Sequence, residues 1–301
     1  MSRHRFVSAQ AAVLDKWGVA AESRFVEVPK ADGPTHVLVA GSGPPLVMLG
    51  GAGTPAAMFA PLMAHLIGYR MYAVDHPGHG LSGRQRGYGD DLARNSVRHI
   101  TGVLGQLKVG RASFLATSFG SRVAFWFADS NSDRVSSAIH IGCPAVALNT
   151  SAPLPMRLMA TRLAKTINRI AAPSESQVRQ LSKMVNEHPL APQITELLIA
   201  TELQEGFACA HHEVLRALVR VRGARPAMAL TEEQLRSVRY PVQIIWGTND
   251  PFGTPDVGRR IAAAIPNAEI HIVSGGHAPW LRSGAEVGSH ASAFLANTPY
   301  P

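Results

Sequence analysis

Short apolar runs recur along the chain and predict buried strands. Several of them are apolar throughout instead of alternating with polar residues, which is typical of strands covered on both faces of a parallel sheet. The predicted strands are residues 25–28, 36–39, 46–49, 71–74, 113–115, 137–141, 242–246 and 270–273.

Helical patterns separate most of the later strands. One apolar stripe at helical spacing covers residues 58–66, and a second covers residues 97–107. Because strands and helices alternate, we expect an α/β fold with a mostly parallel sheet and helices on both of its faces.

The alternation stops between residues 151 and 240. In this stretch one helical pattern follows another, including apolar stripes over residues 156–170 and 214–219. We therefore expect a helical lid, or cap, inserted into one continuous core. On this division, residues 1–150 form the first part of the core, residues 151–240 the cap, and residues 241–301 the second part of the core.

The composition is that of a globular protein with a large core, since 46% of the 301 residues are hydrophobic. The formal net charge is +8, but the arginines are dispersed. In residues 156–169 and 215–225 they lie opposite apolar stripes, as on the solvated face of a helix. We expect no nucleic-acid partner.

The N-terminus carries basic residues but no continuous apolar segment of the signal-peptide type. No later apolar run is long enough to span a bilayer. These features predict a cytoplasmic protein without a membrane span.

The segment FLATSFGSR, residues 114–122, places Ser118 where a predicted strand becomes a helix. It is close to the nucleophile elbow G-x-S-x-G, with Ala116 in place of the first glycine. A serine at the start of a helix also accepts hydrogen bonds from the backbone of the first turn. On these residues alone, Ser118 is either a nucleophile or a helix cap.

Three further segments bear on this choice. AVDHPGHGLSG has the form D-x-P-G-x-G-x-S after a strand, IIWGTNDPFG ends a strand with G-x-x-D, and IVSGGHAPWL ends the final strand with Gly-Gly-His. Together with the elbow they resemble the α/β-hydrolase family over nearly the whole chain, in the family's order Ser, Asp, His. The resemblance implies that Ser118 is the nucleophile, Asp250 the acid and His277 the base. All three also follow predicted strands, at the edge where open parallel sheets bind ligands.

The segment VMLGGAGTP resembles the family's His-Gly-x loop, with Gly50 in the place of the histidine. The resemblance implies an oxyanion hole in which Ala52 donates one backbone N–H and Phe119, next to the nucleophile, donates the other. The missing histidine leaves the choice between Gly51 and Ala52 open.

The remaining candidates for chemistry have simpler explanations. Asp75 is structural in the family, and Asp256 follows Pro255 at the start of a predicted helix. His76 and His79 lie in a Gly/Pro turn, where we expect partly exposed side chains and no metal.

Two further pairs also lack a metal-ligand pattern. His211 and His212 point to different faces of their helix. Cys143 and Cys209 are far apart and show no metal-ligand spacing, so we expect two buried thiols. No metal and no cofactor is expected.

These features predict a serine hydrolase that cleaves a small to medium hydrophobic ester, lactone or thioester through an acyl-enzyme on Ser118. Carbon–carbon bond hydrolysis or cofactor-free perhydrolysis by the same triad, and ligand binding without catalysis, are the alternatives. The acyl and leaving groups and the oligomeric state stay open. Apolar cap residues are expected to roof the serine: Met156, Met159, Leu163, Leu197, Leu198, Leu215 and Leu218.

Overall fold

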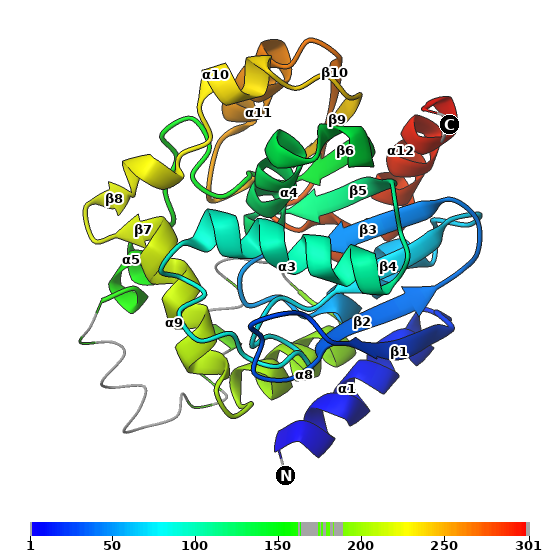
Figure 1. The fold of residues 1–301 in the computed structure, drawn as a ribbon, viewed down its shortest axis with the longest axis vertical. Coiled ribbons are helices and arrows are strands. Elements are labelled where there is room, and N and C mark those ends of the chain that lie inside the picture. The colour runs from blue at the N-terminus through cyan, green and yellow to red at the C-terminus, as the bar shows by residue number, and fades with distance from the viewer. Residues whose placement is uncertain are drawn as a thin grey trace.

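An eight-stranded sheet forms the centre of the molecule, in the order β1-β2-β4-β3-β5-β6-β9-β10 (Figure 1). The computed structural model describes residues 2–161 and 189–298, with positions 163, 174, 176, 179, 180 and 183 between them. β2 pairs antiparallel with β1 and β4, and the other neighbours are parallel. The strands of this sheet are β1 Ala21–Val26, β2 Thr35–Ala40, β3 Pro45–Leu49, β4 Arg70–Val74, β5 Ala112–Thr117, β6 Val135–Ile141, β9 Val242–Gly247 and β10 Ala268–Val273. Seven of the eight predicted ranges lie within them, whereas the first strand begins and ends earlier than the predicted residues 25–28.

Helices cover both faces of the sheet, which explains why its inner strands are apolar throughout. Every residue of β2, β5, β6 and β9 is buried. On one face pack α3 (Leu92–Gln106), α4 (Phe119–Ser130) and α11 (Pro255–Ala264). On the other pack α1 (Ser2–Lys16), α2 (Ala60–Met63) and α12 (Gly284–Asn297). Short 3-10 helices lie at Ala56–Phe59, Ser132–Arg134, Pro226–Met228 and Pro279–Leu281.

Helix α1 was not predicted from the sequence. It buries a narrow stripe made by Phe6, Ala9 and Val13. It packs on α8 (Pro192–Glu202), where Arg5 binds Glu196 through Nε and Nη2 at 2.7 and 3.2 Å. The N-terminus thus contacts a segment that lies between β6 and β9 in the sequence.

That segment leaves the sheet after β6 and returns to β9, which pairs with β6. It contains α5 (Leu154–Met159), α8, α9 (Phe207–Leu218) and α10 (Glu232–Arg236). The expectation that helix simply follows helix is wrong, because β7 (Val219–Arg220) and β8 (Gly223–Ala224) form a hairpin after α9. The predicted stripe over residues 156–170 is described through α5, the turn after it and Leu163, and its members Ile167 and Ile170 lie outside the described residues.

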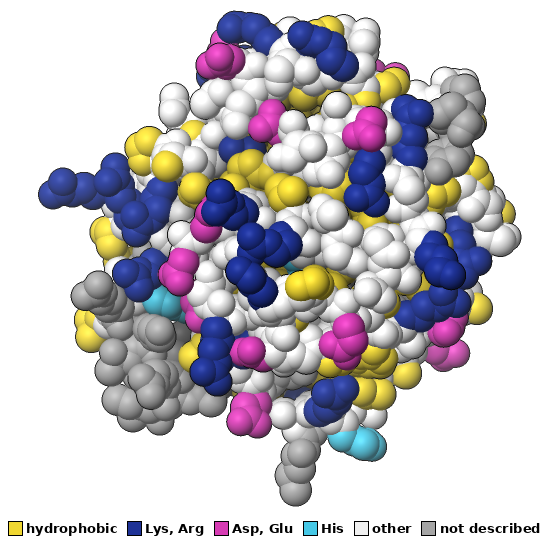
Figure 2. Space-filling view, viewed as in Figure 1, with side chains coloured by type: hydrophobic (Ala, Val, Ile, Leu, Met, Phe, Trp, Pro, Cys, Tyr) yellow, Lys and Arg dark blue, Asp and Glu magenta, His cyan; other side chains and the backbone are white. Residues whose placement is uncertain are grey.

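Basic side chains are spread over the surface. In Figure 2, Lys and Arg residues are scattered across the visible face and do not gather in one patch. Within the described part of the chain, no helix combines the length and the apolar character needed to cross a bilayer. Both cysteines are free, and Cys143 is buried as predicted. Cys209 is only half-buried, which corrects the prediction, because it lies on the face of α9 opposite the buried stripe that contains Phe207, Val214 and Leu218.

Candidate active site

Ser118 stands between β5 and α4 with φ 53° and ψ −117°. A non-glycine residue with positive φ is strained, and such strain is concentrated at functional sites. The tight turn requires Gly120, because a Cβ at that position would collide with the carbonyl oxygen of Leu49 on β3. Ala116 is fully buried in β5, so the methyl group that replaces the first glycine of the motif fits.

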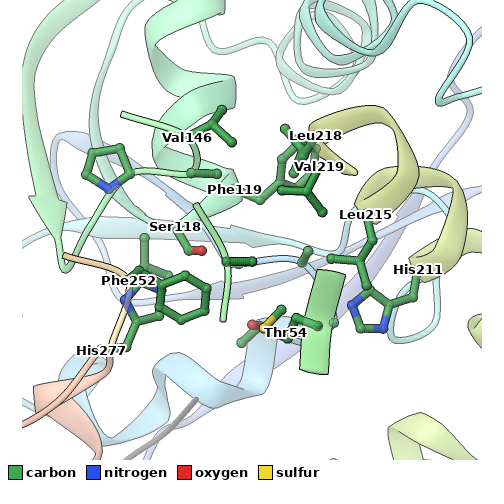
Figure 3. Close-up of a pocket in the computed structure, with 18 of the residues that line it drawn as sticks. Thr54, Ser118, Phe119, Val146, His211, Leu215, Leu218, Val219, Phe252 and His277 are labelled. Carbon is green, nitrogen blue, oxygen red and sulfur yellow. The ribbon is translucent and has the colours of Figure 1, made fainter. Parts of the chain in front are cut away.

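The Ser118 side chain makes no cap hydrogen bond to α4. The hydroxyl therefore does not serve as the cap that the sequence also allowed. Ser118 instead lines a cavity together with His277 (Figure 3), and the figure shows both side chains on the same side of that cavity.

Asp250 lies in the turn after β9 and orients His277. Its Oδ2 accepts hydrogen bonds from His277 Nδ1–H and from the Cys143 N–H, both at 2.8 Å, and its Oδ1 accepts from the Phe252 N–H at 2.9 Å. Gly142, with φ 69°, makes room for the pair, since a Cβ there would lie 3.0 Å from His277 Nδ1. The carboxylate is thus fixed by three donors, and one of them is the imidazole.

His277 follows β10, and its ring is almost fully buried. The Phe252 ring packs on it at a centroid distance of 4.2 Å. Nε2 has no hydrogen-bond partner among the residues that the structure describes. Since Nδ1–H donates to Asp250, Nε2 is the nitrogen left to accept a proton.

The cavity is lined mainly by apolar side chains. Five of the seven predicted roof residues line it, namely Met156, Met159, Leu198, Leu215 and Leu218. The other two predictions are wrong. Leu197 points from α8 into the core that α1 shares, and Leu163 is 69% exposed.

Two ionisable residues of the cavity were missed. Glu202 and His211 both line it, from α8 and α9. Burial raises the pKa of Glu202 to about 7, and burial, with His79 and His212 nearby, lowers the pKa of His211 to about 3. Glu202 lies four residues after Leu198 and His211 four residues before Leu215, so helical spacing from the predicted roof residues could have found them.

His212, as predicted, points away from its neighbour, and its Nε2 hydrogen-bonds to the carbonyl oxygen of Thr161 at 3.0 Å. The described residues contain no group of three or more side chains suited to hold a metal ion.

The loop after β3 borders the nucleophile. Gly51, Ala52 and Phe119 line the same cavity as Ser118. A Cβ on Gly51 would lie 3.2 Å from the Ser118 Cβ and 3.6 Å from its Oγ. As the first residue of α4, Phe119 has an N–H without an acceptor inside its helix. The backbone N–H groups implied by the family resemblance therefore lie beside the serine.

The expectation that His76 and His79 are partly exposed is wrong. Both are fully buried, because α9 covers their turn and places the Phe207 ring 5.4 Å from the His79 ring. Burial is the main cause that lowers the pKa of both histidines, to about 4 for His76.

Asp75 and Asp256 lie away from the His277 ring. Asp75 is buried and accepts hydrogen bonds from the N–H groups of Ala56 and Leu81 at 2.7 and 3.0 Å, with His36 Nδ1 at 2.7 Å. Asp256 is exposed in the first turn of α11 and pairs with Arg259 at 2.8 Å. Of the three aspartates considered from the sequence, Asp250 is the one that contacts the imidazole of His277.

Comparison with known proteins adds sequence and fold relatives. A family profile described as alpha/beta hydrolase fold matches residues 44–281. A 2-hydroxy-6-oxononadienedioate/2-hydroxy-6-oxononatrienedioate hydrolase from Cupriavidus pinatubonensis is 32% identical over 78% of this chain and 75% of its own.

Solved structures share the fold. Carboxylesterase CesB from Bacillus subtilis is 20% identical, with a TM-score of 0.78 over 98% of this chain and 99% of its own. A 2-hydroxy-6-oxo-6-phenylhexa-2,4-dienoate hydrolase from Rhodococcus is 17% identical, with a TM-score of 0.73 over 91% of this chain and 99% of its own. At these identities the structural likeness is one of fold.

Proposed function

The chain belongs to the α/β hydrolase fold family, and we propose that it is a serine hydrolase that cleaves a carbon–carbon bond next to a ketone, in a small to medium substrate that carries an apolar group on that ketone. The observation that carries the proposal is the cavity shared by Ser118 and His277, with His277 held by Asp250 and its Nε2 left to accept a proton. A serine hydroxyl is a weak nucleophile unless such a base removes its proton.

In the proposed mechanism, His277 takes the Ser118 proton as the Oγ attacks the ketone carbon. Asp250 holds the imidazole in the tautomer with hydrogen on Nδ1 and stabilises the imidazolium. The oxygen of the tetrahedral intermediate is bound by the N–H of Phe119 and by an N–H of the glycine loop, from Ala52 or Gly51.

In a 2-hydroxy-6-oxodienoate, cleavage needs prior ketonisation, in which the 2-hydroxyl loses a proton and C5 gains one, giving the 2,6-dioxo tautomer. The bond between C5 and C6 then breaks, and its electron pair stays on C5 as a carbanion conjugated, through the C3–C4 double bond, with the C2 carbonyl. The His277 imidazolium returns its proton to this carbon, which leaves an acyl ester on Ser118. Water, activated by the now neutral His277, hydrolyses the ester and restores the serine.

The bond type is suggested by the sequence relatives. Their names describe hydrolases of 2-hydroxy-6-oxo dienedioates, which are ketones with a conjugated chain and two carboxylates. This favours carbon–carbon cleavage over the ester cleavage that we first expected from the sequence.

The lining of the cavity favours a substituent on the ketone that differs from the carboxylate-bearing chain in the relatives' substrates. No Lys or Arg is among the described lining residues, whereas Glu202 contributes a carboxyl group. A second substrate carboxylate would meet a negative charge there whenever Glu202 is ionised. We therefore propose a neutral, apolar group on the ketone in place of the second carboxylate.

Ester hydrolysis is a second candidate because the same lining lacks a described cation. An apolar ester needs none, while a dienoate carries at least one carboxylate. In both cases we propose that α5, α8 and α9 act as a cap that supplies the apolar roof of the cavity.

The test compares three substrates with wild-type protein and with Ser118→Ala: a 2-hydroxy-6-oxodienoate with an alkyl group on the ketone, the corresponding dienedioate, and a p-nitrophenyl ester of the same acyl group. We expect the highest kcat/KM for the alkyl ketone. Ser118→Ala should lose activity on all three substrates, and a fluorophosphonate should label Ser118 in the wild-type protein.

The outcomes separate the alternatives. An ester kcat/KM that exceeds the ketone value by about 10-fold or more, a difference of ~1.4 kcal/mol in activation free energy, would favour the second candidate. Activity that survives in Ser118→Ala would contradict both. Tight substrate binding without turnover or labelling would favour a non-catalytic ligand-binding protein.

A further inference from the structure

The imidazole of His76 lies behind the glycine loop that borders Ser118. His76 follows Asp75 after β4, and its Nε2 lies 2.9 Å from the carbonyl oxygen of Gly50. A carbonyl oxygen only accepts hydrogen bonds, so Nε2 carries the hydrogen and donates. Burial, with His79 nearby, lowers the pKa of His76 to about 4, which keeps the ring neutral and in this tautomer at neutral pH.

This hydrogen bond fixes more than one atom. The Gly50 carbonyl and the Gly51 N–H belong to the same planar peptide unit, so holding the oxygen also sets the direction of that N–H. The next peptide unit is held in the same way, since the Thr54 N–H donates to the Gly51 carbonyl at 3.1 Å. That second unit carries the Ala52 N–H. The two hydrogen bonds thus orient both candidate donors of the oxyanion hole.

The loop depends on such an anchor because of its composition. Positions 50, 51 and 53 are glycines, whose backbones populate many conformations. Gly50 also has no side chain through which the loop could hold itself. The anchor therefore comes from a neighbouring strand end, through a ring that is fully buried.

The same ring contacts the other side of the site. Its centroid lies 4.9 Å from that of Phe119, whose side chain is also fully buried. Phe119 carries the second candidate donor, next to the nucleophile. One imidazole therefore contacts both segments that would bind the oxyanion.

We infer that His76 is a positioning residue, which holds loop 50–52 so that its N–H groups face the substrate oxygen at Ser118. The inference rests on the proposed function of Ser118 and adds a requirement to it. Loss of the hydrogen bond should weaken binding of the tetrahedral intermediate more than binding of the substrate, because the oxyanion forms only after attack.

The central variant is His76→Phe, which keeps a ring against Phe119 and removes the donor to Gly50. We expect kcat on p-nitrophenyl butyrate to fall about 10- to 100-fold, with KM changed by less than about 2-fold. His76→Gln should recover part of the loss, because its amide N–H₂ can donate to the same carbonyl.

His79→Phe is the matched control. His79 is an equally buried imidazole of the same turn, but its Nδ1 lies 3.0 Å from the carbonyl oxygen of Pro77 within that turn. Its replacement should leave kcat within about 3-fold of wild type. Values for the histidine variants are expressed per active site, counted by fluorophosphonate labelling run to completion, so that lost folding is not mistaken for lost catalysis. Ser118→Ala has no serine to label, so its values are expressed per folded protein, measured by circular dichroism.

Ser118→Ala in the same assay separates the two proposals. If Ser118→Ala is inactive and His76→Phe keeps the wild-type kcat per site, the role of His76 is wrong and the proposed function stands. If Ser118→Ala is active, the proposed function itself is wrong. Should His76→Phe fail to fold, His76→Met also removes the donor and places a flexible side chain in the same space. A wild-type kcat per site in that variant would then show that the role of His76 is wrong.

Discussion

Nδ1 of His277 lies 2.8 Å from Oδ2 of Asp250, although the two residues are 27 positions apart in the chain. β9 and β10 are parallel neighbours, so the turns that follow them emerge at the same edge of the sheet. The pair is further fixed by backbone donors from Cys143, after β6, and Phe252. Three chain segments therefore determine how the imidazole is oriented in the cavity.

The first prediction is that Asp250→Asn lowers kcat about 10³- to 10⁴-fold, because an amide at this position no longer favours the tautomer with hydrogen on His277 Nδ1. Steady-state kinetics per labelled site would measure the loss. Asp256→Asn is the control, since its exposed side chain pairs only locally with Arg259, and it should stay within about 2-fold of wild type. A larger loss in Asp256→Asn than in Asp250→Asn would show that the acid has been assigned wrongly.

Asp75→Asn tests the structural role of the other strand-end aspartate. Its carboxylate accepts two backbone N–H groups and lies 2.7 Å from His36 Nδ1. We expect the variant to lose about 2–4 kcal/mol of unfolding free energy, as measured in urea, because a buried acceptor is replaced by a group that also donates. Per labelled site, kcat should fall far less than in Asp250→Asn; an equal loss would argue for a catalytic role.

Substitution of Ser118 should separate catalysis from stability. Ser118→Ala and Ser118→Gly should both reduce kcat/KM by about four to six orders of magnitude. Glycine adopts φ 53° and ψ −117° without strain, so Ser118→Gly should be more stable than Ser118→Ala by on the order of 1 kcal/mol. Urea unfolding of the two variants measures this difference, and equal stabilities would mean that the elbow carries no such strain.

Much of the fold could be predicted because the inner strands are covered on both faces. Strands such as β5 and β9 are apolar throughout, and the sequence shows them directly. Helix α1 was missed because it buries few side chains and has no acidic residue in its first turn. The hairpin of β7 and β8 was missed because strands of two residues leave no pattern.

The candidate site likewise contains residues that could be predicted from the sequence and residues that could not. Ser118, Asp250 and His277 follow strand ends and carry local motifs, so the sequence indicated them. The roles of Glu202 and His211 depend on how α8 and α9 pack over the sheet, which no local pattern contains. The burial of His79 likewise depends on the Phe207 side chain, which is far away in the sequence.

Stability should depend on pH through Glu202. Burial raises its folded-state pKa from 4.5 to about 7. Between these values the unfolded chain releases a proton that the folded protein keeps, so the contribution of Glu202 to stability falls as pH rises from about 4.5 to 7. Above this window both states are ionised and the contribution is constant.

Glu202→Gln should remove this contribution. The Tm of wild type, relative to that of Glu202→Gln, should therefore decrease from pH 5 to pH 7 and then level off. Thermal unfolding of both proteins at a series of pH values measures this difference in Tm. Glu205→Gln, at an exposed position three residues further on, is the control and should follow wild type. A constant difference between wild type and Glu202→Gln across this window would refute the assignment.

The last prediction concerns the length of the acyl group. An apolar cavity gains up to about 0.8 kcal/mol for each buried methylene, so kcat/KM should rise with chain length and fall once the cavity is full. Both Leu197 and Leu198 of α8 belong to the core, but of the two only Leu198 also lines the cavity. Leu198→Ala should therefore move the optimum to a chain one or two carbons longer, as measured with a series of p-nitrophenyl esters or 6-alkyl dienoates.

Leu197→Ala is the matched control, since it removes the same atoms from the adjacent position. It should lower the unfolding free energy by about 2–5 kcal/mol and leave the chain-length optimum unchanged, because the space it creates lies in the core. If the two variants shift the optimum equally, the profile reflects general loosening of α8. If neither shifts it, Leu198 does not limit the substrate, and the cap would have only a structural role at this position.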